Sequence, residues 1–397
     1  MQGCVSLTAL AHENLNADMK ILAVYFRAGS GVSVIYERVI EQLAKHAEVD
    51  ILTNQAPISD MASVHKVYTH PFSKSRSKWY RKFVRWFGAT PFSSSWSNEA
   101  MGLLNENYDL VIAFVTSAQL TPVVFGRLYA MRHNAKFAIY SVDAIPAPGG
   151  WTRPCEYRGK MRVVARNFAA ADYVASSNRH MLDFQLTTFK HKEGLRSNVL
   201  LTPSPAKEYR LPMGDSATIL YTGSLYGLRN PDYFFSAFKR LLKEHPEAEV
   251  IFVGMGMKFR HMRSILTAEE LKHVTVLGHT DNLEPLFRRA TVLLDINADR
   301  ESDPFLSSKI ITYLKTNRVI VTECGADTPT REVFAGLDTI ILAEHSAESL
   351  YDSLTLALKR AHSNPDYLER EEVIRRFSIE EVTSIFWQDI VELCNNK

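Results

Sequence analysis

The chain has 397 residues, of which 46% are apolar, 23% charged and 11% aromatic. It can therefore bury a large core and is neither disordered nor collagen-like, and its length suggests two domains. Forty-six Lys and Arg residues against 44 Asp and Glu residues leave a net charge of +2. Such a balance argues against a general nucleic-acid binder, so any basic function is regional.

The four scattered cysteines form no CxxC pair, which predicts a reducing compartment and no structural zinc. The longest apolar runs, such as Ile21 to Phe26, fall well short of the ~18 residues that a membrane span needs. Residues 1–18 lack the basic start and the long apolar stretch of a signal peptide. The sequence therefore predicts a soluble, cytoplasmic chain.

Short runs rich in Val, Ile, Leu and Tyr alternate with longer amphipathic segments, a pattern typical of parallel sheets covered by helices. In the first half we predict strands at Lys20–Phe26, Val49–Thr53, His65–Tyr68, Asp109–Val115, Lys136–Asp143, Tyr173–Ser176 and Val199–Thr202. Pro203, Pro205 and Pro212 then interrupt any regular element. This break predicts the linker between two domains.

A second series of strands is predicted at Thr218–Tyr221, Glu249–Val253, Val274–Leu277, Val292–Asp295, Val319–Thr322 and Thr339–Leu342, with the clearest helix at Tyr233–Glu244. An apolar stripe over Ile379–Leu393 predicts a further helix that needs a partner surface. We expect an extension at 1–18, a first domain at 19–205, a linker at 206–215, a second domain at 216–376 and a final helix at 377–397. The predicted fold class is α/β, with two doubly wound, Rossmann-like domains facing each other.

Open parallel sheets bind ligands beyond the carboxyl ends of their strands. After the first strand stand Gly29, Ser30 and Gly31, a GxG start without the third glycine of a dinucleotide fingerprint. These residues form either a tight strand-to-helix turn or a ligand contact.

The first strand of the second domain precedes Gly223, Ser224, Gly227 and Arg229, directly before a helix opened by Pro231. This loop is either a diphosphate cradle in which Arg229 neutralises charge, or a turn with a surface arginine.

Two more loops follow strands of the same predicted sheet. One carries Gly254 and Gly256, and the other runs from Asp299 into a helix whose first turn holds Ser307, Ser308 and Lys309. Backbone N–H groups and a lysine suit phosphate oxygens, whereas Glu301 and Asp303 suit hydroxyls. The alternative is a capped helix behind a solvated, charged loop.

In their order and spacing, these stretches resemble the nucleotide-sugar-binding domain of family 4 glycosyltransferases, which have the GT-B fold. The matching segments are Tyr221–Pro231, Val253–Gly256, Leu277–His279, Phe305–Val321 and Phe377–Val382. The resemblance covers most of residues 216–395, with a looser match of architecture over 19–205. It implies that the final helix crosses back to the first domain.

The resemblance also implies an activity: transfer of a hexosyl or deoxyhexosyl group, with retention of configuration, from a nucleotide-sugar to a saccharide or lipid-linked acceptor in surface polysaccharide or glycoconjugate synthesis. The donor is then held by the second domain, and the acceptor enters from the first across an interdomain cleft. The implied donor contacts are Gly223 and Arg229 at the diphosphate, Gly278 at the base, and Ser308 and Lys309 at the phosphates. Ser224, Gly254, Gly256, Glu301 and Asp303 complete the donor side; no cofactor is expected, since the nucleotide-sugar is a substrate.

Two residues depart from the family pattern. Thr312 stands where family members often carry a glutamate for the ribose, and Val142 stands where a histidine often lies beside the reacting sugar. These departures keep open a catalytically degenerate nucleotide-sugar-binding protein. A sugar-nucleotide epimerase remains open as well, because it can share the same two-domain architecture.

Glycosyl transfer needs charge stabilisation on the departing nucleoside diphosphate, a role that suits Arg229 and Lys309. The chain has no DxD triplet and no pair of histidines at zinc-ligand spacing, so we expect no obligatory catalytic metal. Asp143, predicted at a strand end on the acceptor side with Gly29, Ser30 and Gly31, either orients an acceptor hydroxyl or caps the loop that follows it.

The segment Lys74–Phe87 is basic and aromatic. Its Lys and Arg residues are Lys74, Arg76, Lys78, Arg81, Lys82 and Arg85, and its aromatic residues are Trp79, Tyr80, Phe83, Trp86 and Phe87. On a helix, four of the aromatics share one face between the basic groups, which suits an anionic membrane surface. An ordinary helix with a solvated basic face is the alternative, and single-stranded nucleic acid is disfavoured because nothing else in the chain supports it. The protein is thus expected in the cytoplasm, with peripheral attachment to the inner membrane face left open.

Overall fold

The structure is a computed structural model, which describes residues 19–27, 30–72, 78–88, 90–212, 216–254, 259, 261–362 and 367–395. The chain forms two compact units, the first comprising residues up to Thr202 together with those from Ile379, and the second spanning Pro203–Ser378. Each unit contains one parallel sheet.

The strands of the first unit are β1 (Lys20–Tyr25), β2 (Glu48–Thr53), β3 (Lys66–Thr69), β4 (Leu110–Val115), β5 (Lys136–Ser141), β6 (Tyr173–Ser176) and β7 (Arg196–Val199). Its helices are α2 (Ser30–Leu43), α3 (Lys78–Phe87), α4 (Thr90–Met101), α5 (Thr121–His133), α6 (Pro154–Phe168), α7 (Arg179–Thr188) and α15 (Ile379–Asn395). The strands lie in the order β3-β2-β1-β4-β5-β6-β7. The order reverses beside β1, as in a doubly wound sheet.

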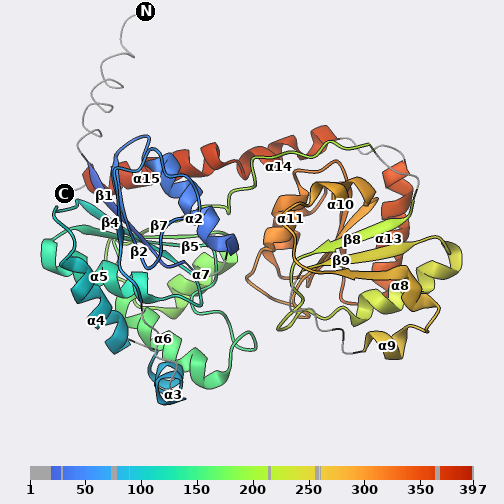
Figure 1. The fold of residues 1–397 in the computed structure, drawn as a ribbon, viewed down its shortest axis with the longest axis horizontal. Helices are drawn as coiled ribbons and strands as arrows, with labels where there is room; N and C mark the ends of the chain where they lie inside the picture. The colour runs from blue at the N-terminus through green and yellow to red at the C-terminus, as the bar shows by residue number, and fades with distance from the viewer. Residues whose placement is uncertain are drawn as a thin grey trace, which may run out of the picture. The chain divides into compact units, whose positions relative to one another are not determined.

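Both faces of this sheet are buried. Leu22 and Val24 of β1 point into a core with α5 and α6, whereas Ile21 and Ala23 point to the opposite core with α2 and α15. On α15, Phe386 is fully buried, with its ring 5.6 Å from that of Tyr140. Figure 1 shows α15, in red, beside α2, in blue. The apolar stripe of the final helix therefore packs within the first unit.

The second unit has strands β8 (Thr218–Thr222), β9 (Glu249–Val253), β10 (Val274–Leu277), β11 (Val292–Ile296), β12 (Val319–Glu323) and β13 (Ile340–Ala343), in the order β10-β9-β8-β11-β12-β13. Its helices are α8 (Asp232–Glu244), α9 (Met262–Ile265), α10 (Glu284–Arg289), α11 (Ser308–Tyr313), α12 (Pro329–Phe334), α13 (Ala347–His362) and α14 (Glu371–Arg376), with short 3-10 turns at Glu270–His273 and Tyr367–Arg370. The order reverses between β8 and β11.

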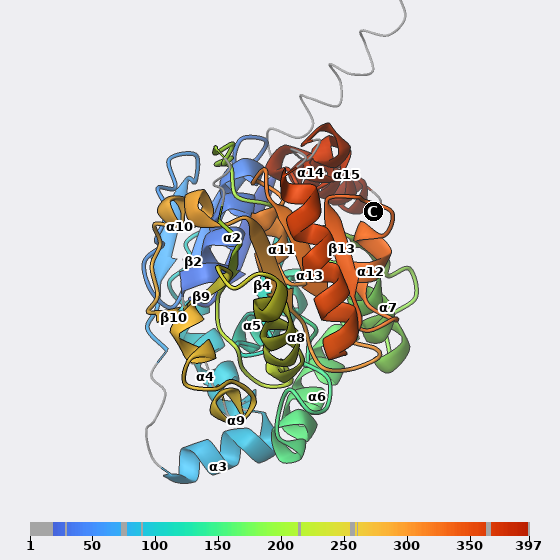
Figure 2. The ribbon, with the colours of Figure 1, turned by 90° about the vertical axis from the view of Figure 1, so that its right-hand side faces the viewer.

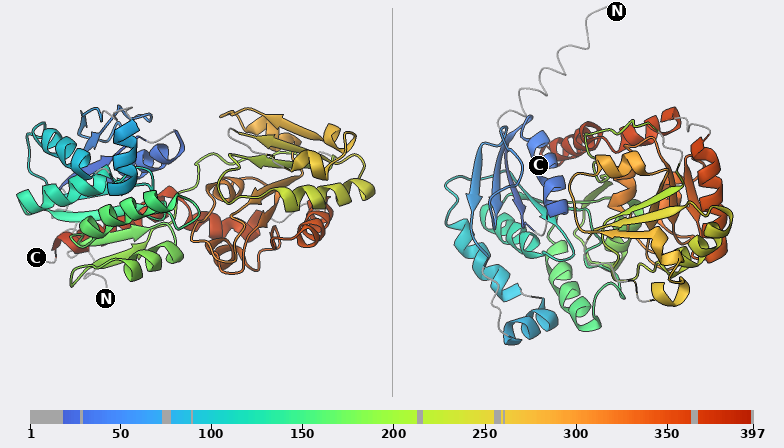
Figure 3. Two further views of the ribbon diagram at one scale, coloured as in Figure 1. Left: turned by 90° about the horizontal axis from the view of Figure 1, so that it is seen from below. Right: turned by 45° about the vertical axis from the view of Figure 1, so that its right-hand side comes forward.

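Helices again cover both faces of this second sheet. Figure 2 shows α8 and α13 side by side over one face, and both views in Figure 3 show strands as a layer between helices. Phe234 and Phe238 of α8 pack with Leu354 of α13 against the strands. No helix in the described part of the chain is long and apolar enough to cross a bilayer.

One predicted strand is misplaced. We predicted Val199–Thr202, but β7 occupies Arg196–Val199 and pairs with β6 alone, at the edge of its sheet. An edge strand needs few apolar residues because one side of it faces solvent. The apolar run Val199–Leu201 therefore indicated the wrong segment.

Candidate functional site

Two glycines lie at the carboxyl ends of β8 and β9, where their backbones touch. Gly223 has φ +106° and Gly254 has φ +148°, conformations that favour glycine. A Cβ on Gly254 would lie 2.3 Å from the carbonyl oxygen of Gly223, and one on Gly223 would lie 3.1 Å from the side chain of Lys309. Neither position has room for a larger residue without a shift of its neighbours.

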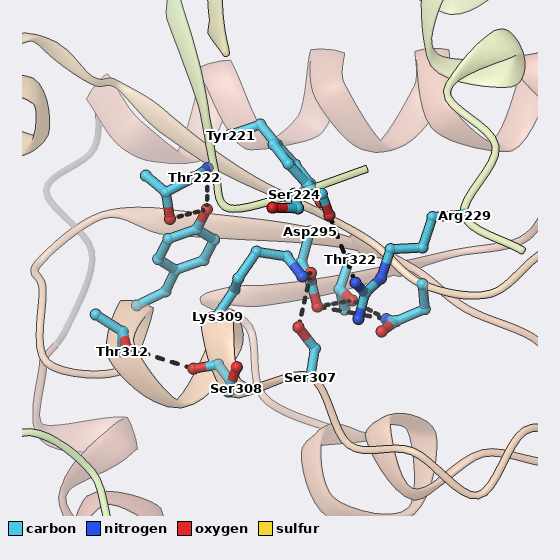
Figure 4. A network of polar contacts seen from close by, with 12 residues as sticks. Tyr221, Thr222, Ser224, Arg229, Asp295, Ser307, Ser308, Lys309, Thr312 and Thr322 are labelled. Carbon is cyan, nitrogen blue, oxygen red and sulfur yellow. Dashed lines mark hydrogen bonds and ion pairs between the residues drawn. The ribbon is translucent and has the colours of Figure 1, made fainter. Parts of the chain in front are cut away.

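Lys309, in the first turn of α11, reaches back to the end of β11. Its Nζ lies 3.2 Å from Oδ1 of Asp295, a carboxylate with no exposed surface, and only 11% of the lysine side chain is exposed. Ser307 donates a hydrogen bond of 2.9 Å to the same oxygen. Figure 4 shows both side chains converging on Asp295. The buried carboxylate thus fixes the start of α11.

Burial lowers the pKa of Lys309 to about 8, against the attraction of Asp295, and the positive charge of Arg229 lowers it further. The ammonium group lies 5.4 Å from the ring centre of Tyr221. At neutral pH most of this lysine is charged, but it lies close to a second cation. An anion between Lys309 and Arg229 would be favourably placed between two positive charges.

Arg229 lies on the loop after β8. Its guanidinium is 4.9 Å from the ring centre of Tyr226, and Nη1 lies 3.5 Å from the carbonyl oxygen of Ser224. The backbone of Arg229 bridges to that of Ala298, so this loop is joined to the loop after β11. The network of Figure 4 includes Arg229 with Lys309, Asp295 and Tyr221.

A polar contact also anchors the last turn of α11. The hydroxyl of Tyr313 accepts a 2.8 Å hydrogen bond from the backbone N–H of Thr222 and lies 3.0 Å from the Thr222 hydroxyl. The ends of β8 and β11 therefore hold α11 at both of its termini.

A cavity of about 480 Å³ opens beside the loop after β8. It is lined by residues 225–232 and by His261, whose Nδ1 lies 2.5 Å from Oδ2 of Asp232. Because Arg229 is in its wall, this hollow adjoins the network around Lys309. It offers room for a ligand of modest size next to Arg229.

The other predicted donor residues are more dispersed. Ser308 and Glu301 are exposed, whereas Asp303 is buried and lies 3.4 Å from the backbone N–H of Phe305. Thr312 donates a 3.3 Å hydrogen bond to the carbonyl of Ser308, one turn earlier.

Two further glycines, Gly278 and Gly256, were predicted on the donor side. Gly278 is exposed in the loop after β10, and a Cβ at this position would have no neighbouring atom within 4 Å. Gly256 lies outside the described residues.

Among the residues predicted for the acceptor side, Asp143 follows β5 by two residues. Its Oδ2 lies 3.3 Å from the backbone N–H of Ser117. Burial raises the pKa of Asp143, against the hydrogen bonds of Ser117 that lower it. Ser30 and Gly31 begin α2, and Gly29 lies outside the described residues.

Sequence reasoning missed Asp295. It is the last residue of the strand that we predicted at Val292–Asp295, and it lies inside the observed strand β11. A single carboxylate inside such a strand is itself a signal, because a buried charge requires a partner.

Among the described residues, one group offers three closely spaced carboxylate or imidazole ligand atoms, formed by Glu48, His65 and Glu106. The ammonium group of Lys20 already pairs with both carboxylates, at 3.1 Å from Glu48 and in direct contact with Glu106. These residues therefore form an ion-pair cluster at the amino ends of the strands.

The helix α3 has large aromatic side chains exposed on its surface. Trp79 is 81% and Phe87 is 53% exposed, and Nζ of Lys82 lies 5.8 Å from the ring centre of Trp79. The helix packs against α6, where Arg162 Nη1 donates to the backbone carbonyl of Trp86 at 3.3 Å. Large aromatic side chains and cations thus share one exposed surface.

Comparisons with known proteins support the predicted architecture. Residues 216–360 match the family model described as glycosyl transferases group 1. None of the curated protein sequences matches the chain.

Among solved structures, Anabaena HepE in complex with UDP and glucose is 13% identical, with a TM-score of 0.66, over 94% of this chain and 100% of that one. The lipopolysaccharide outer core galactosyltransferase WaaB is 14% identical, with a TM-score of 0.60, and the match covers 94% of this chain and 99% of WaaB. A putative UDP-N-acetylglucosamine 2-epimerase from Listeria monocytogenes is 13% identical, with a TM-score of 0.54, and the match covers 93% of this chain and 95% of the epimerase. The predicted fold, two doubly wound α/β domains of the GT-B kind, is confirmed.

The contact between Gly223 and Gly254 generates a prediction about stability. Gly254→Ala should destabilise the protein by about 1–3 kcal/mol, because alanine disfavours this φ and its methyl group meets the Gly223 carbonyl. Gly278→Ala is the matched control and should change stability by less than about 0.5 kcal/mol. Thermal unfolding of the two variants measures the difference; equal midpoints would contradict the close packing.

Proposed function

Because residues 216–360 match the family model described as glycosyl transferases group 1 and the chain has a GT-B fold, we propose that this protein transfers a sugar from a nucleotide-sugar donor to a saccharide or lipid-linked acceptor. The observation that carries the proposal is the placement of Lys309 and Arg229 at the carboxyl edge of the second sheet, around the buried carboxylate of Asp295. Gly223 and Gly254 leave the backbone beside the lysine without side chains.

The chemistry of the reaction matches this arrangement. As the glycosidic bond to the donor breaks, negative charge develops on the nucleoside diphosphate that leaves. Cations fixed in advance stabilise that charge without reorganisation. Lys309 is held by Asp295, and Arg229 by its loop contacts, so both can serve as preorganised counter-charges.

We further propose a uridine diphosphate sugar as the first donor to test, since Anabaena HepE was solved with UDP and glucose. In this scheme the transferred group is a hexosyl or deoxyhexosyl unit, the configuration is retained, and the product is a surface polysaccharide or glycoconjugate. Asp143 is assigned to the orientation of the acceptor hydroxyl, because it stands just beyond the carboxyl end of β5, where open parallel sheets bind ligands. Burial raises the pKa of this carboxyl group.

The proposal is tested by incubating the protein with UDP-sugars, with and without saccharide and lipid-linked acceptors. We expect transfer to an acceptor; an isomerised sugar nucleotide would instead identify an epimerase, and binding without turnover a degenerate transferase. Excess chelator should leave transfer undiminished, because the sequence has no DxD triplet. Loss of transfer that added metal restores would overturn the metal-independent scheme.

Replacing either cation should impair the reaction more than it impairs folding. We expect Lys309→Met and Arg229→Ala each to lower turnover at least about tenfold, since each removes charge that stabilises the leaving group. Lys272→Ala is the control, because Lys272 is exposed and pairs with Glu269, 2.6 Å away on the same surface turn. Steady-state kinetics measure the effect, and unchanged kinetics in both site variants would refute the assignment.

Lys309→Met also leaves Asp295 buried without its cation, which can destabilise the fold. The double variant Lys309→Met with Asp295→Asn removes that unpaired charge. If the double variant folds like the wild type and still loses turnover, the loss belongs to the chemistry.

We propose in addition that α3 attaches the protein to an anionic membrane surface. Its exposed aromatics, Trp79, Phe83, Trp86 and Phe87, suit the interface of a bilayer, and exposed Lys78 and Lys82 suit anionic headgroups. A lipid-linked acceptor would lie at that same surface.

Sedimentation with vesicles containing anionic lipid tests this attachment. Binding should weaken as salt rises, because screening shortens the reach of the basic groups. The variant with Lys78, Arg81, Lys82 and Arg85 changed to Gln should lose most of the binding, whereas Lys78→Arg with Lys82→Arg should retain it. Equal sedimentation of the wild type and the Gln variant at low salt would show that the charges play no part.

A further inference from the structure

The loop after β11, residues 297–307, carries Glu301 and Asp303 and leads into Lys309, and it is fastened to its neighbours on two sides. On one side the backbone N–H of Asp299 donates to the carbonyl of Leu228 at 2.9 Å. On the other, Ser302 bridges to Asp327, whose N–H donates to the Glu301 carbonyl at 2.9 Å. These contacts on both sides therefore determine where Glu301 and Asp303 lie.

A histidine outside this loop also holds it. His345 follows β13 by two residues, and only 12% of its side chain is exposed. Nδ1 lies 2.7 Å from Oε1 of Glu323, the last residue of β12, and Nε2 lies 3.2 Å from the carbonyl oxygen of Arg300. Glu323 itself is fully buried, and its Oε2 has no hydrogen-bond partner among the described residues.

This arrangement places an acceptor on each side of one ring. The Arg300 carbonyl can only accept, and so can an ionised Glu323 carboxylate. A neutral imidazole has one N–H and can satisfy only one of the two acceptors. Both contacts form together only when the pair holds one additional proton, either as imidazolium with carboxylate or as a carboxyl group with neutral imidazole.

The surroundings favour retention of that proton. Burial raises the pKa of Glu323 to about 7, against the opposing contribution of His345, and the carboxylates of Asp299 and Asp295 raise it further. Burial alone would lower the pKa of His345, but Glu323 outweighs it, and the net shift is upward.

The other titratable groups near the pair come from different elements. The pKa of Tyr233 on α8 is raised mainly by the charge of Asp299 and to a smaller extent by that of Glu323. Cys324 is the next residue after Glu323 at the end of β12. Arg331 of α12 donates to the backbone carbonyls of Cys324 and Gly325.

We propose that His345 and Glu323 are positioning residues that hold the loop 297–307, and with it the donor-binding edge of the second unit, only while they share a proton. The role in donor binding rests on the proposed function, whereas the fastening of the loop does not. Neither residue needs to touch the reacting sugar, since both act through the Arg300 carbonyl.

The direction of the pH dependence follows from the raised pKa of His345. The unfolded imidazole titrates near 6.5, and the folded pair keeps its proton to higher pH. The contribution of the pair to stability is therefore complete below pH 6.5 and is lost as pH rises through the pKa of the folded pair. Above that pH one of the two contacts breaks and the loop loosens.

The test is hydrogen exchange of the intact protein, without nucleotide, from pH 6 to 9, corrected for the intrinsic pH dependence of exchange. The reporters are the amides of Asp303 and Asp327, which bond across the loop, and the control amide is that of Tyr209, which bonds to Lys315. The exchange rate of the loop amides should rise about tenfold across the titration. A change of that size is expected when one hydrogen bond to a charged group is lost. Imidazole NMR signals of His345 should titrate over the same range.

Variants separate this role from a merely structural one. Glu323→Gln can donate an amide N–H to Nδ1 of neutral His345, so both contacts survive without the extra proton, and loop exchange should become independent of pH. In His345→Phe the loop amides should exchange rapidly at every pH. The control His245→Gln alters an exposed pair with Glu247 and should behave like the wild type.

UDP affinity, measured by calorimetry over the same pH range, then connects the loop to the donor site. In the wild type the affinity for UDP should weaken over the pH range in which the loop opens. In Glu323→Gln this loss of affinity with pH should be absent. A wild-type loop whose exchange is flat with pH, or a Glu323→Gln loop that keeps the wild-type dependence, would overturn the proposal. If the exchange results are as expected but UDP does not bind at any pH, the proposed donor class fails and the proton-dependent fastening stands.

Discussion

The candidate site depends on one buried carboxylate. Asp295 has no exposed surface, and a charge in that position is tolerated only when it is paired and hydrogen-bonded. Lys309 supplies the cation and Ser307 a hydrogen bond, both to Oδ1. Because these two partners belong to the start of α11, satisfaction of Asp295 also determines where that helix begins. The requirement of one strand residue thus places the cation proposed to bind the donor.

Pairing with Asp295 does not neutralise the site completely. Burial and the nearby charge of Arg229 together outweigh the attraction of Asp295 and keep the pKa of Lys309 below that of an ordinary lysine. Asp295 carries one negative charge and so cannot neutralise both Lys309 and Arg229. A diphosphate would supply the missing negative charge, and the crossing of Gly223 and Gly254 leaves that edge free of bulky side chains.

Much of the architecture was predictable from local patterns. Buried parallel strands read as continuous apolar runs, which is why β9 and β6 were predicted with their observed bounds. The polar edge strand β7 gives no such run and was misplaced. The amphipathic period of α8 likewise indicated Tyr233–Glu244, one residue short of its observed start.

The site was harder to predict, because its contacts join residues distant in sequence. Glycine content marked the loops at Gly223 and Gly254, but their mutual contact arises only because β8 and β9 are neighbours in the sheet. The link between Lys309 and Asp295 depends on the return of α11 over β11. His345 and Glu323 were missed for the same reason, since a lone histidine or a strand-end glutamate has no local pattern that indicates a partner.

The two buried carboxylates of this sheet edge belong to adjacent strands and are compensated differently. Asp295 of β11 pairs with Thr322 in register, one position before Glu323 of β12. Asp295 has a lysine partner, which stays mostly charged at neutral pH, whereas Glu323 has a histidine, whose charge depends on pH in the physiological range.

Each carboxylate holds a different point of the same loop. Ser307 closes the end of the loop onto Asp295, and His345 holds its middle at Arg300. Loss of a proton from the histidine pair therefore releases the middle of the loop while the lysine end stays in place. A loop anchored in this way can change the position of Glu301 and Asp303 without displacing Lys309. Its effect should therefore fall on the hydroxyl groups of a donor, which in UDP are those of the ribose, more than on the diphosphate.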